Sequence, residues 1–211
     1  MTAFITHCWR RKQSDLIGLL ACVCLVWGLA FPARAEPLVP AISALHLERA
    51  GDAVLLTATV NFELSAAVQD ALLKGVAIIF VAETQVLRER WYWTNKEVAR
   101  VERHMRLAYQ PLTRRWRLNV GANVATNTGL GMALNQNFES MADALAIVQR
   151  FSGWKIADIA DIDLAQPHRV VLHFHLDASQ LPRPLQIGTL GQSDWSISVT
   201  SSQPLVLDDD K

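Results

Sequence analysis

Hydrophobic and polar residues alternate along much of this chain and predict a mostly β structure. From Val54 to Leu64 every second residue is apolar, and polar residues occupy most of the positions between them. This period of two is typical of a strand with one buried and one solvated face. The segment from Val76 to Arg88 begins with apolar side chains on both faces, which predicts a central strand. Further alternating segments are 98–109, 114–120 and 170–176.

Shorter segments extend this β pattern. A strand over 42–48 connects to the one at Val54 through Ala50-Gly51-Asp52, a tripeptide that favours a hairpin turn. Two more short strands are expected at 154–159 and 195–199.

Capping residues predict two short helices. The first follows Ser65 and ends at Gly75, because serine is a good N-cap and glycine terminates helices. The second follows Ser140, which resembles the first residue of a capping box with Asp143, and runs to about Phe151.

Two segments show neither the alternation typical of strands nor the capping pattern typical of helices. The stretch 121–137 is rich in Gly, Asn and Thr and predicts a long loop. Leu181-Pro182-Arg183-Pro184 lacks two backbone donors and predicts a connection or a sheet edge. The elements together predict a mainly β (α+β) fold, an antiparallel β-sandwich or curved sheet of about seven to eight strands with two short helices.

The first 35 residues differ from the rest and predict a signal peptide. Residues 10–12 are basic, 16–31 form an uncharged apolar run, and 33–35 read Ala-Arg-Ala, with small residues at both positions that signal peptidase recognises. The alternative is an uncleaved segment that tethers the protein to the inner membrane. In either case the following domain is expected in the periplasm.

One globular domain over 36–200 and a polar C-terminal tail over 201–211 are expected after cleavage. The cysteines, Cys8, Cys22 and Cys24, all precede this domain. Disulfides and cysteine-based zinc sites are therefore excluded within it, and its own core must stabilise it.

Composition narrows the function classes. The chain is 51% hydrophobic and carries 20 basic and 20 acidic residues, which excludes a disordered or collagen-like protein. Four of the basic residues and one of the acidic ones precede residue 36, so the exported part has a net charge of −3. This charge disfavours nucleic acid as a partner. A multi-span membrane protein is excluded because only one segment is long and apolar enough to approach a bilayer span.

Short motifs between residues 42 and 197 carry a family resemblance. They include Leu72-Leu73-Lys74-Gly75-Val76, Phe80-Val81-Ala82-Glu83, Arg90-Trp91-Tyr92-Trp93, Leu112-Thr113-Arg114, Trp116-Arg117, Phe138-Glu139-Ser140, Gly153-Trp154, Leu181-Pro182-Arg183-Pro184 and Asp194-Trp195. Together they resemble a bacterial envelope family known as domain of unknown function 4390, or proline-rich signal peptide protein. The resemblance implies export and a single domain, without an established activity or catalytic residues. It also implies a possible partner, since members are often encoded beside a membrane sensor kinase.

A basic segment interleaved with aromatic residues is the first candidate site. Between Arg88 and Arg117 there are nine basic and three acidic residues, a charge of +6, which leaves −9 on the rest of the exported chain. The planar guanidinium group of arginine binds carboxylates and phosphates, and aromatic rings stack on arginine or sugars. The candidate binding residues are Arg90, Trp91, Trp93, Arg100, Arg106, Arg115 and Arg117. The alternative is an ordinary solvated sheet face with its tryptophans in the core.

Two histidines form the second candidate site. His173 and His175 lie two residues apart on a predicted strand, so both rings point to one face, where His168 or Asp177 would add a third metal ligand. The alternative is that they are simply polar residues on the wet face of that strand.

The sequence contains no G-x-S-x-G, H-E-x-x-H or phosphate-loop motif, so no cofactor and no enzyme are predicted. We therefore expect an exported, non-catalytic interaction or sensory-accessory module whose arginine- and tryptophan-rich face binds a protein partner, a glycan or a lipid headgroup. A metal-dependent hydrolase or metal carrier that uses the histidines is the alternative.

Overall fold

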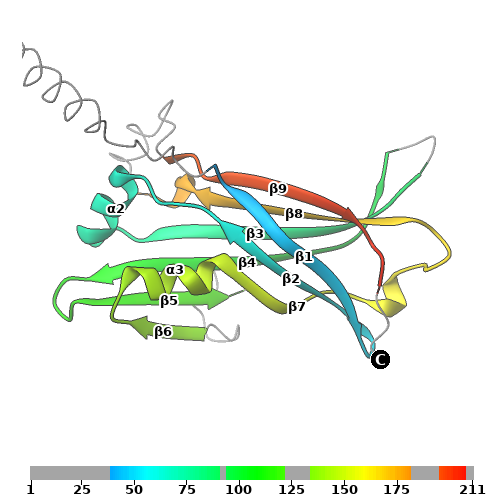
Figure 1. The fold of residues 1–211 in the computed structure, drawn as a ribbon, viewed down its shortest axis with the longest axis horizontal. Helices are drawn as coiled ribbons and strands as arrows, with labels where there is room; N and C mark the ends of the chain where they lie inside the picture. Colours follow the sequence, from blue (N-terminus) through cyan, green and yellow to red (C-terminus); the bar gives the residue numbers. More distant parts are fainter. Residues whose placement is uncertain (1–38, 91–93, 122–133, 182–194, 208–211) are drawn as a thin grey trace, which may run out of the picture. The chain divides into compact units, whose positions relative to one another are not determined.

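Nine strands form two antiparallel sheets in the computed structural model, which describes residues 39–90, 94–121, 134–181 and 195–207 (Figure 1). The smaller sheet has the order β1-β2-β7, and the larger has the order β6-β5-β4-β3-β8-β9. The predicted mainly β fold with two short helices is confirmed. The segment interpreted as a signal peptide, 1–35, lies outside the described residues.

The elements have the following bounds. The smaller sheet consists of β1 (Ala41–Ala50), β2 (Ala53–Asn61) and β7 (Arg150–Asp158). The larger sheet consists of β3 (Ile78–Arg88), β4 (Lys96–Gln110), β5 (Arg115–Gly121), β6 (Leu134–Phe138), β8 (His168–Asp177) and β9 (Ser198–Pro204). The helices are α2 (Ala66–Leu73) and α3 (Met141–Gln149), and two 3-10 turns cover Ile159–Asp161 and Ala178–Gln180.

The predicted local signals explain several of these elements. Strand β3 pairs with both β4 and β8, so it occupies the central position that its apolar first half predicts. The Ser65 hydroxyl accepts a hydrogen bond from the Val68 N–H, and Ser140 accepts one from the Asp143 N–H, so both helices begin at the predicted caps. Gly75 has φ of +83° after α2, a left-handed conformation that favours glycine.

Two segment expectations need correction. The predicted loop over 121–137 ends in strand β6, whose polar residues pair with β5; backbone pairing and not hydrophobicity makes it a strand. The last strand runs over Ser198–Pro204 and not 195–199, because β8 supplies pairing partners from His175 back to Arg169. The first residues of the expected polar tail therefore belong to the larger sheet.

The core lies between the two sheets and is rich in aromatic residues. Phe80 and Phe174 of the larger sheet are fully buried, as is Phe151 of the smaller sheet. The Phe62 ring, directly after β2, lies 5.4 Å from the Phe80 ring and 5.2 Å from the Phe174 ring. These contacts join the sheets, and the opposite face of the larger sheet remains available for polar side chains. Neither described helix is long and apolar enough to span a membrane.

Candidate functional site

The outer face of the larger sheet gathers most of the polar candidate residues. Central strand β3 places Val81 between His104 of β4 and His175 of β8, each directly opposite it. Side chains directly opposite on neighbouring strands lie on the same face. Two polar strand faces that are far apart in the sequence thus meet on one surface across β3.

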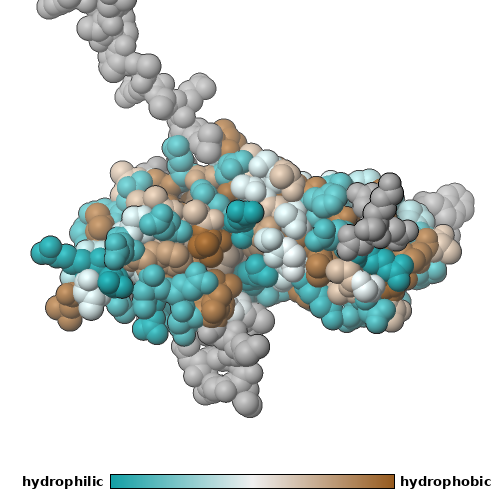
Figure 2. Space-filling view, turned by 60° about the horizontal axis from the view of Figure 1, so that its bottom comes forward, coloured by the Kyte–Doolittle hydropathy of each residue, from teal (hydrophilic) through white to brown (hydrophobic). Residues whose placement is uncertain are grey.

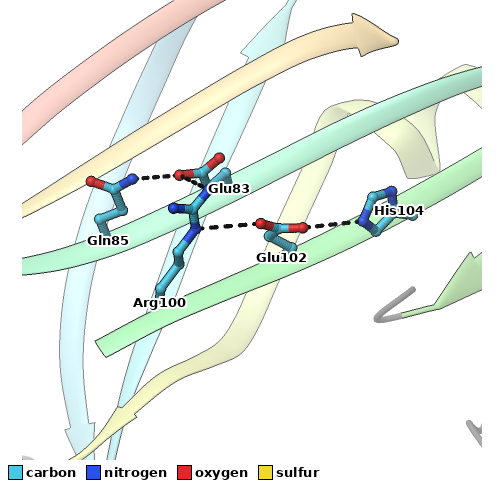
Figure 3. Close-up of polar contacts among 5 residues, drawn as sticks. All are labelled: Glu83, Gln85, Arg100, Glu102 and His104. Atoms are coloured by element: carbon cyan, nitrogen blue, oxygen red, sulfur yellow. Dashed lines mark hydrogen bonds and ion pairs between the residues drawn. The ribbon is translucent and has the colours of Figure 1, made fainter. Parts of the chain in front are cut away.

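A charged network crosses β3 and β4 on this face (Figure 3). The Arg100 guanidinium contacts Glu83 at 3.0 Å and Glu102 at 3.3 Å. The second Glu102 oxygen lies 3.3 Å from Nε2 of His104, and the Gln85 amide donates a hydrogen bond to Glu83. Arg100 lies on the predicted face, but two carboxylates compensate its charge, so it is not a free cation.

The histidine pair continues this polar surface onto β8. The His173 and His175 rings stack with centroids 4.7 Å apart and an interplanar angle of 19°. Nε2 of His173 lies 3.2 Å from the Ser198 hydroxyl of β9. Nδ1 of His175 and Nδ1 of His104 are buried, and neither has a hydrogen-bond partner among the described residues. Protonation of both stacked rings would place like charges in close contact.

The structure places the two predicted third metal ligands differently with respect to this pair. His168 is buried on the core side of β8, where its Nδ1 lies 2.8 Å from the Gln166 carbonyl. Asp177 shares the face of His175, but it accepts hydrogen bonds from the N–H and the hydroxyl of Ser179. The described residues contain no group of three or more side chains placed to hold a metal ion.

Burial is the main cause that lowers the pKa of His175 from its ordinary value of 6.5. Neighbouring His173 and, more weakly, His104 lower this pKa further, whereas the charges of Asp177 and Glu83 raise it. Between the lowered value and 6.5, the unfolded chain binds a proton that the folded chain does not. His175 therefore contributes stability that is complete above pH 6.5 and decreases as the pH falls below it.

We expect the substitution His175→Gln to weaken the acid sensitivity of the fold. The thermal midpoint of the original protein should decrease when the pH is lowered from about 8 to about 5. The decrease should be smaller for the variant, because glutamine does not titrate. Thermal unfolding followed by circular dichroism checks this. His46→Gln, on β1, is the matched control, and an equal effect of both substitutions would contradict the assignment.

Three arginines form a basic surface beside the charged network. Arg106 of β4 lies opposite Asn119 of β5, and Arg115 and Arg117 occupy the same face of β5. All three arginines are exposed. Arg115 has a 3.7 Å contact with exposed Glu139, and within the described part of the chain Arg106 and Arg117 form no ion pair or hydrogen bond. We call Arg106, Arg115 and Arg117 the arginine face.

The structure describes only some of the residues in the aromatic part of the predicted binding region. Arg90 is exposed, and Trp91 and Trp93, which follow it, lie outside the described residues. Trp116 is buried in the core, with its ring centroid 4.9 Å from that of Tyr109. For Trp116 the structure thus supports the alternative in which the tryptophans of this segment pack inside.

Arg103 is the residue that sequence reasoning missed. It lies on the core side of β4, with its guanidinium carbon 4.6 Å from the Trp154 ring centroid and 5.6 Å from that of Phe151, both on β7. Burial lowers the pKa of Arg103, and no carboxylate among the described residues pairs with it. The alternation along β4 could have revealed this position, because it places Arg103 on the same face as buried Met105 and not on the face of the exposed arginines.

Comparison with known proteins concerns almost the whole described chain. No curated protein and no solved structure matches it. The family model described as Domain of unknown function (DUF4390) matches residues 40–203, from the start of β1 almost to the end of β9. The chain therefore belongs to this family.

Proposed function

We propose that this protein is an exported, non-catalytic interaction module that binds an anionic partner through its arginine face. The observation that carries the proposal is the free charge of Arg106 and Arg117, which have no carboxylate partner among the described residues. Unpaired exposed guanidinium groups on a rigid sheet are well placed to form paired hydrogen bonds with carboxylates or phosphates. The nearby Arg100 differs because Glu83 and Glu102 already compensate it.

The surroundings of the arginine face add neutral hydrogen-bonding groups, and Glu139, in 3.7 Å contact with Arg115, is a competing carboxylate. Register places Asn119 of β5 beside Asn135 of β6, and their side chains are hydrogen bonded at 3.0 Å. Asn137 lies opposite Arg117 on the same surface. The face therefore combines positive charge with neutral polar groups, a composition that suits a hydrated, polar interface.

Charge segregation supports a role in partner choice. The segment from Arg88 to Arg117 carries +6, whereas the remainder of the exported chain carries −9. Opposite potentials on two parts of one protein orient an acidic partner toward the basic part and disfavour other orientations. An acidic surface of an envelope protein fits this arrangement, and the periplasmic part of a membrane sensor kinase is our leading candidate from the family resemblance.

We expect the double substitution Arg106→Glu with Arg115→Glu to weaken partner binding by about a hundredfold, because like charges replace a complementary contact. The thermal midpoint should stay nearly unchanged, since both side chains are exposed. The protein is cross-linked in intact cells, and co-purifying proteins and lipids are identified and quantified by mass spectrometry.

The matched control is Arg150→Glu with Lys155→Glu, the same charge change at exposed positions of β7 in the smaller sheet. This control should keep the partner. If the original protein and the variant with Arg106→Glu and Arg115→Glu recover the partner equally, the arginine face does not bind it.

A further inference from the structure

Strand β6 differs from the other sheet edges of the described structure. Among the described residues no strand pairs with its outer side, and its sequence, Leu-Asn-Gln-Asn-Phe, contains no charge and no proline. Its pairing with β5 runs over five consecutive residues without a register shift. Alternate residues of an edge strand direct their N–H and C=O groups outward, and no described strand pairs with those groups of β6.

The other edges carry features that discourage pairing. Strand β1 has a register irregularity between Ser43 and His46, and Ala44 there has φ of +50°. Strand β7 has two register shifts against β2 and bears charged side chains. Strand β9 ends in Pro204 and runs close to β1 of the other sheet. Bulges, charges and proline are among the usual protections of an edge, and β6, although it is only five residues long, has none of these three.

Each face beside the β6 edge favours a different kind of side chain. On the outer face the arginine face lies on β5, one strand away, so an added strand would lie about 10 Å from β5. That separation is within the combined reach of an arginine and a glutamate side chain. On the opposite face Leu134 is 58% exposed, and Ile147 of α3, a helix that packs against β5 and β6, is 41% exposed.

We infer that β6 is a docking edge for an extended segment of a partner protein in which acidic and apolar residues alternate. The segment adds as a seventh strand to the larger sheet, with its acidic side chains toward Arg117 of the arginine face and its apolar side chains toward Leu134. Main-chain hydrogen bonds supply affinity and the alternate side chains supply specificity. This inference rests on the proposed function, because it uses the arginine face to select acidic side chains.

Charge argues against a second copy of this chain as the occupant. Pairing of two β6 edges would bring two arginine faces onto one continuous sheet, where like charges repel. An acidic segment gains from the same charges. Figure 2 turns the lower border of Figure 1, where β6 lies, toward the viewer, and hydrophobic residues (brown) lie there among hydrophilic ones (teal).

The test measures binding of a short, fluorescently labelled peptide, in which glutamate and valine alternate, to the full protein. Fluorescence anisotropy should show binding that is about tenfold weaker for a peptide of equal composition with all glutamates placed before all valines. Hydrogen exchange measured by mass spectrometry should show slower exchange over 134–138 when the alternating peptide is bound. Unchanged exchange in that segment, or no binding, would overturn the inference.

Proline substitutions at adjacent edge positions test the main-chain contacts. Of Gln136→Pro and Asn137→Pro, one removes an N–H that points away from β5, because outward groups alternate. The variant that keeps the thermal midpoint should bind the peptide about tenfold more weakly. Equal affinity in that variant would contradict strand addition.

The outcomes separate this inference from the proposed function. If both peptides bind equally and only the arginine-face variant loses them, strand addition is wrong while the arginine face keeps its role. If neither peptide binds and the arginine-face variant still retains its cellular partner, both proposals fall. Sedimentation of the peptide-free protein should show a monomer, and a dimer that the proline variant dissociates would assign the edge to self-association instead.

Discussion

Replacement of Phe174 by alanine should reduce the free energy of unfolding by about 3–5 kcal/mol. Phe174 is fully buried, and its ring centroid lies 5.2 Å from Phe62, 5.9 Å from Phe80 and 6.4 Å from Phe151. It therefore contacts aromatic side chains from both sheets. The substitution removes these contacts and leaves a cavity that a layered core cannot fill by collapse.

Urea denaturation at fixed temperature measures this effect, and a domain of this kind has only about 5–15 kcal/mol of stability to lose. The variant should thus unfold at a much lower urea concentration or be partly unfolded without urea. Leu112→Ala is the control because the Leu112 side chain is fully exposed in the β4–β5 turn. A loss below about 1 kcal/mol for Phe174→Ala would mean that this cluster does not join the sheets.

The second large effect is expected for Arg103→Glu, which should destabilise the fold by roughly 2–4 kcal/mol at neutral pH. The Arg103 guanidinium lies over the ring faces of Trp154 and Phe151, where an aromatic ring attracts a cation and repels an anion. The introduced carboxylate is partly desolvated without a basic partner. Its protonation relieves this cost, so the destabilisation should decrease as the pH falls toward about 4.

Arg106→Glu provides the matched control for this experiment. It makes the same charge change on the same strand, but on the exposed face, and should alter the free energy of unfolding by less than about 0.5 kcal/mol. Arg103→Lys keeps a cation without the planar fork and should give an intermediate loss. Equal destabilisation by Arg103→Glu and Arg106→Glu would show that the contact between the sheets contributes nothing specific.

Local signals in the sequence were sufficient for most of the individual elements. Alternation identified β2, β4, β5 and β8, and the serines at 65 and 140 located both helix starts. These features depend on residues that are close in sequence, where a side-chain period of two or a cap hydrogen bond is set by the backbone itself. The shared face of Arg106, Arg115 and Arg117 followed from the same alternation once the two strands paired as a hairpin.

Strand β6 shows where local signals failed. Its Asn-Gln-Asn centre favours a loop, yet the residues from Leu134 to Phe138 pair with β5. A backbone ladder formed with the preceding strand outweighs weak intrinsic propensity. The same reason explains why β9 includes polar residues up to Pro204, since β8 extends beside them.

The sequence by itself established the β-rich class, the helix caps and the basic character of the segment between Arg88 and Arg117. Only the tertiary structure determined which of those charges are free. Pairing of β3 with β4 brought Glu83 to Arg100, which also contacts Glu102 two residues along its own strand, and packing of the second sheet enclosed Arg103. Within the described residues no carboxylate pairs with Arg106 or Arg117. The spacing of residues along a strand fixes the face on which each one lies, whereas the partner it meets there depends on strands far away in the chain.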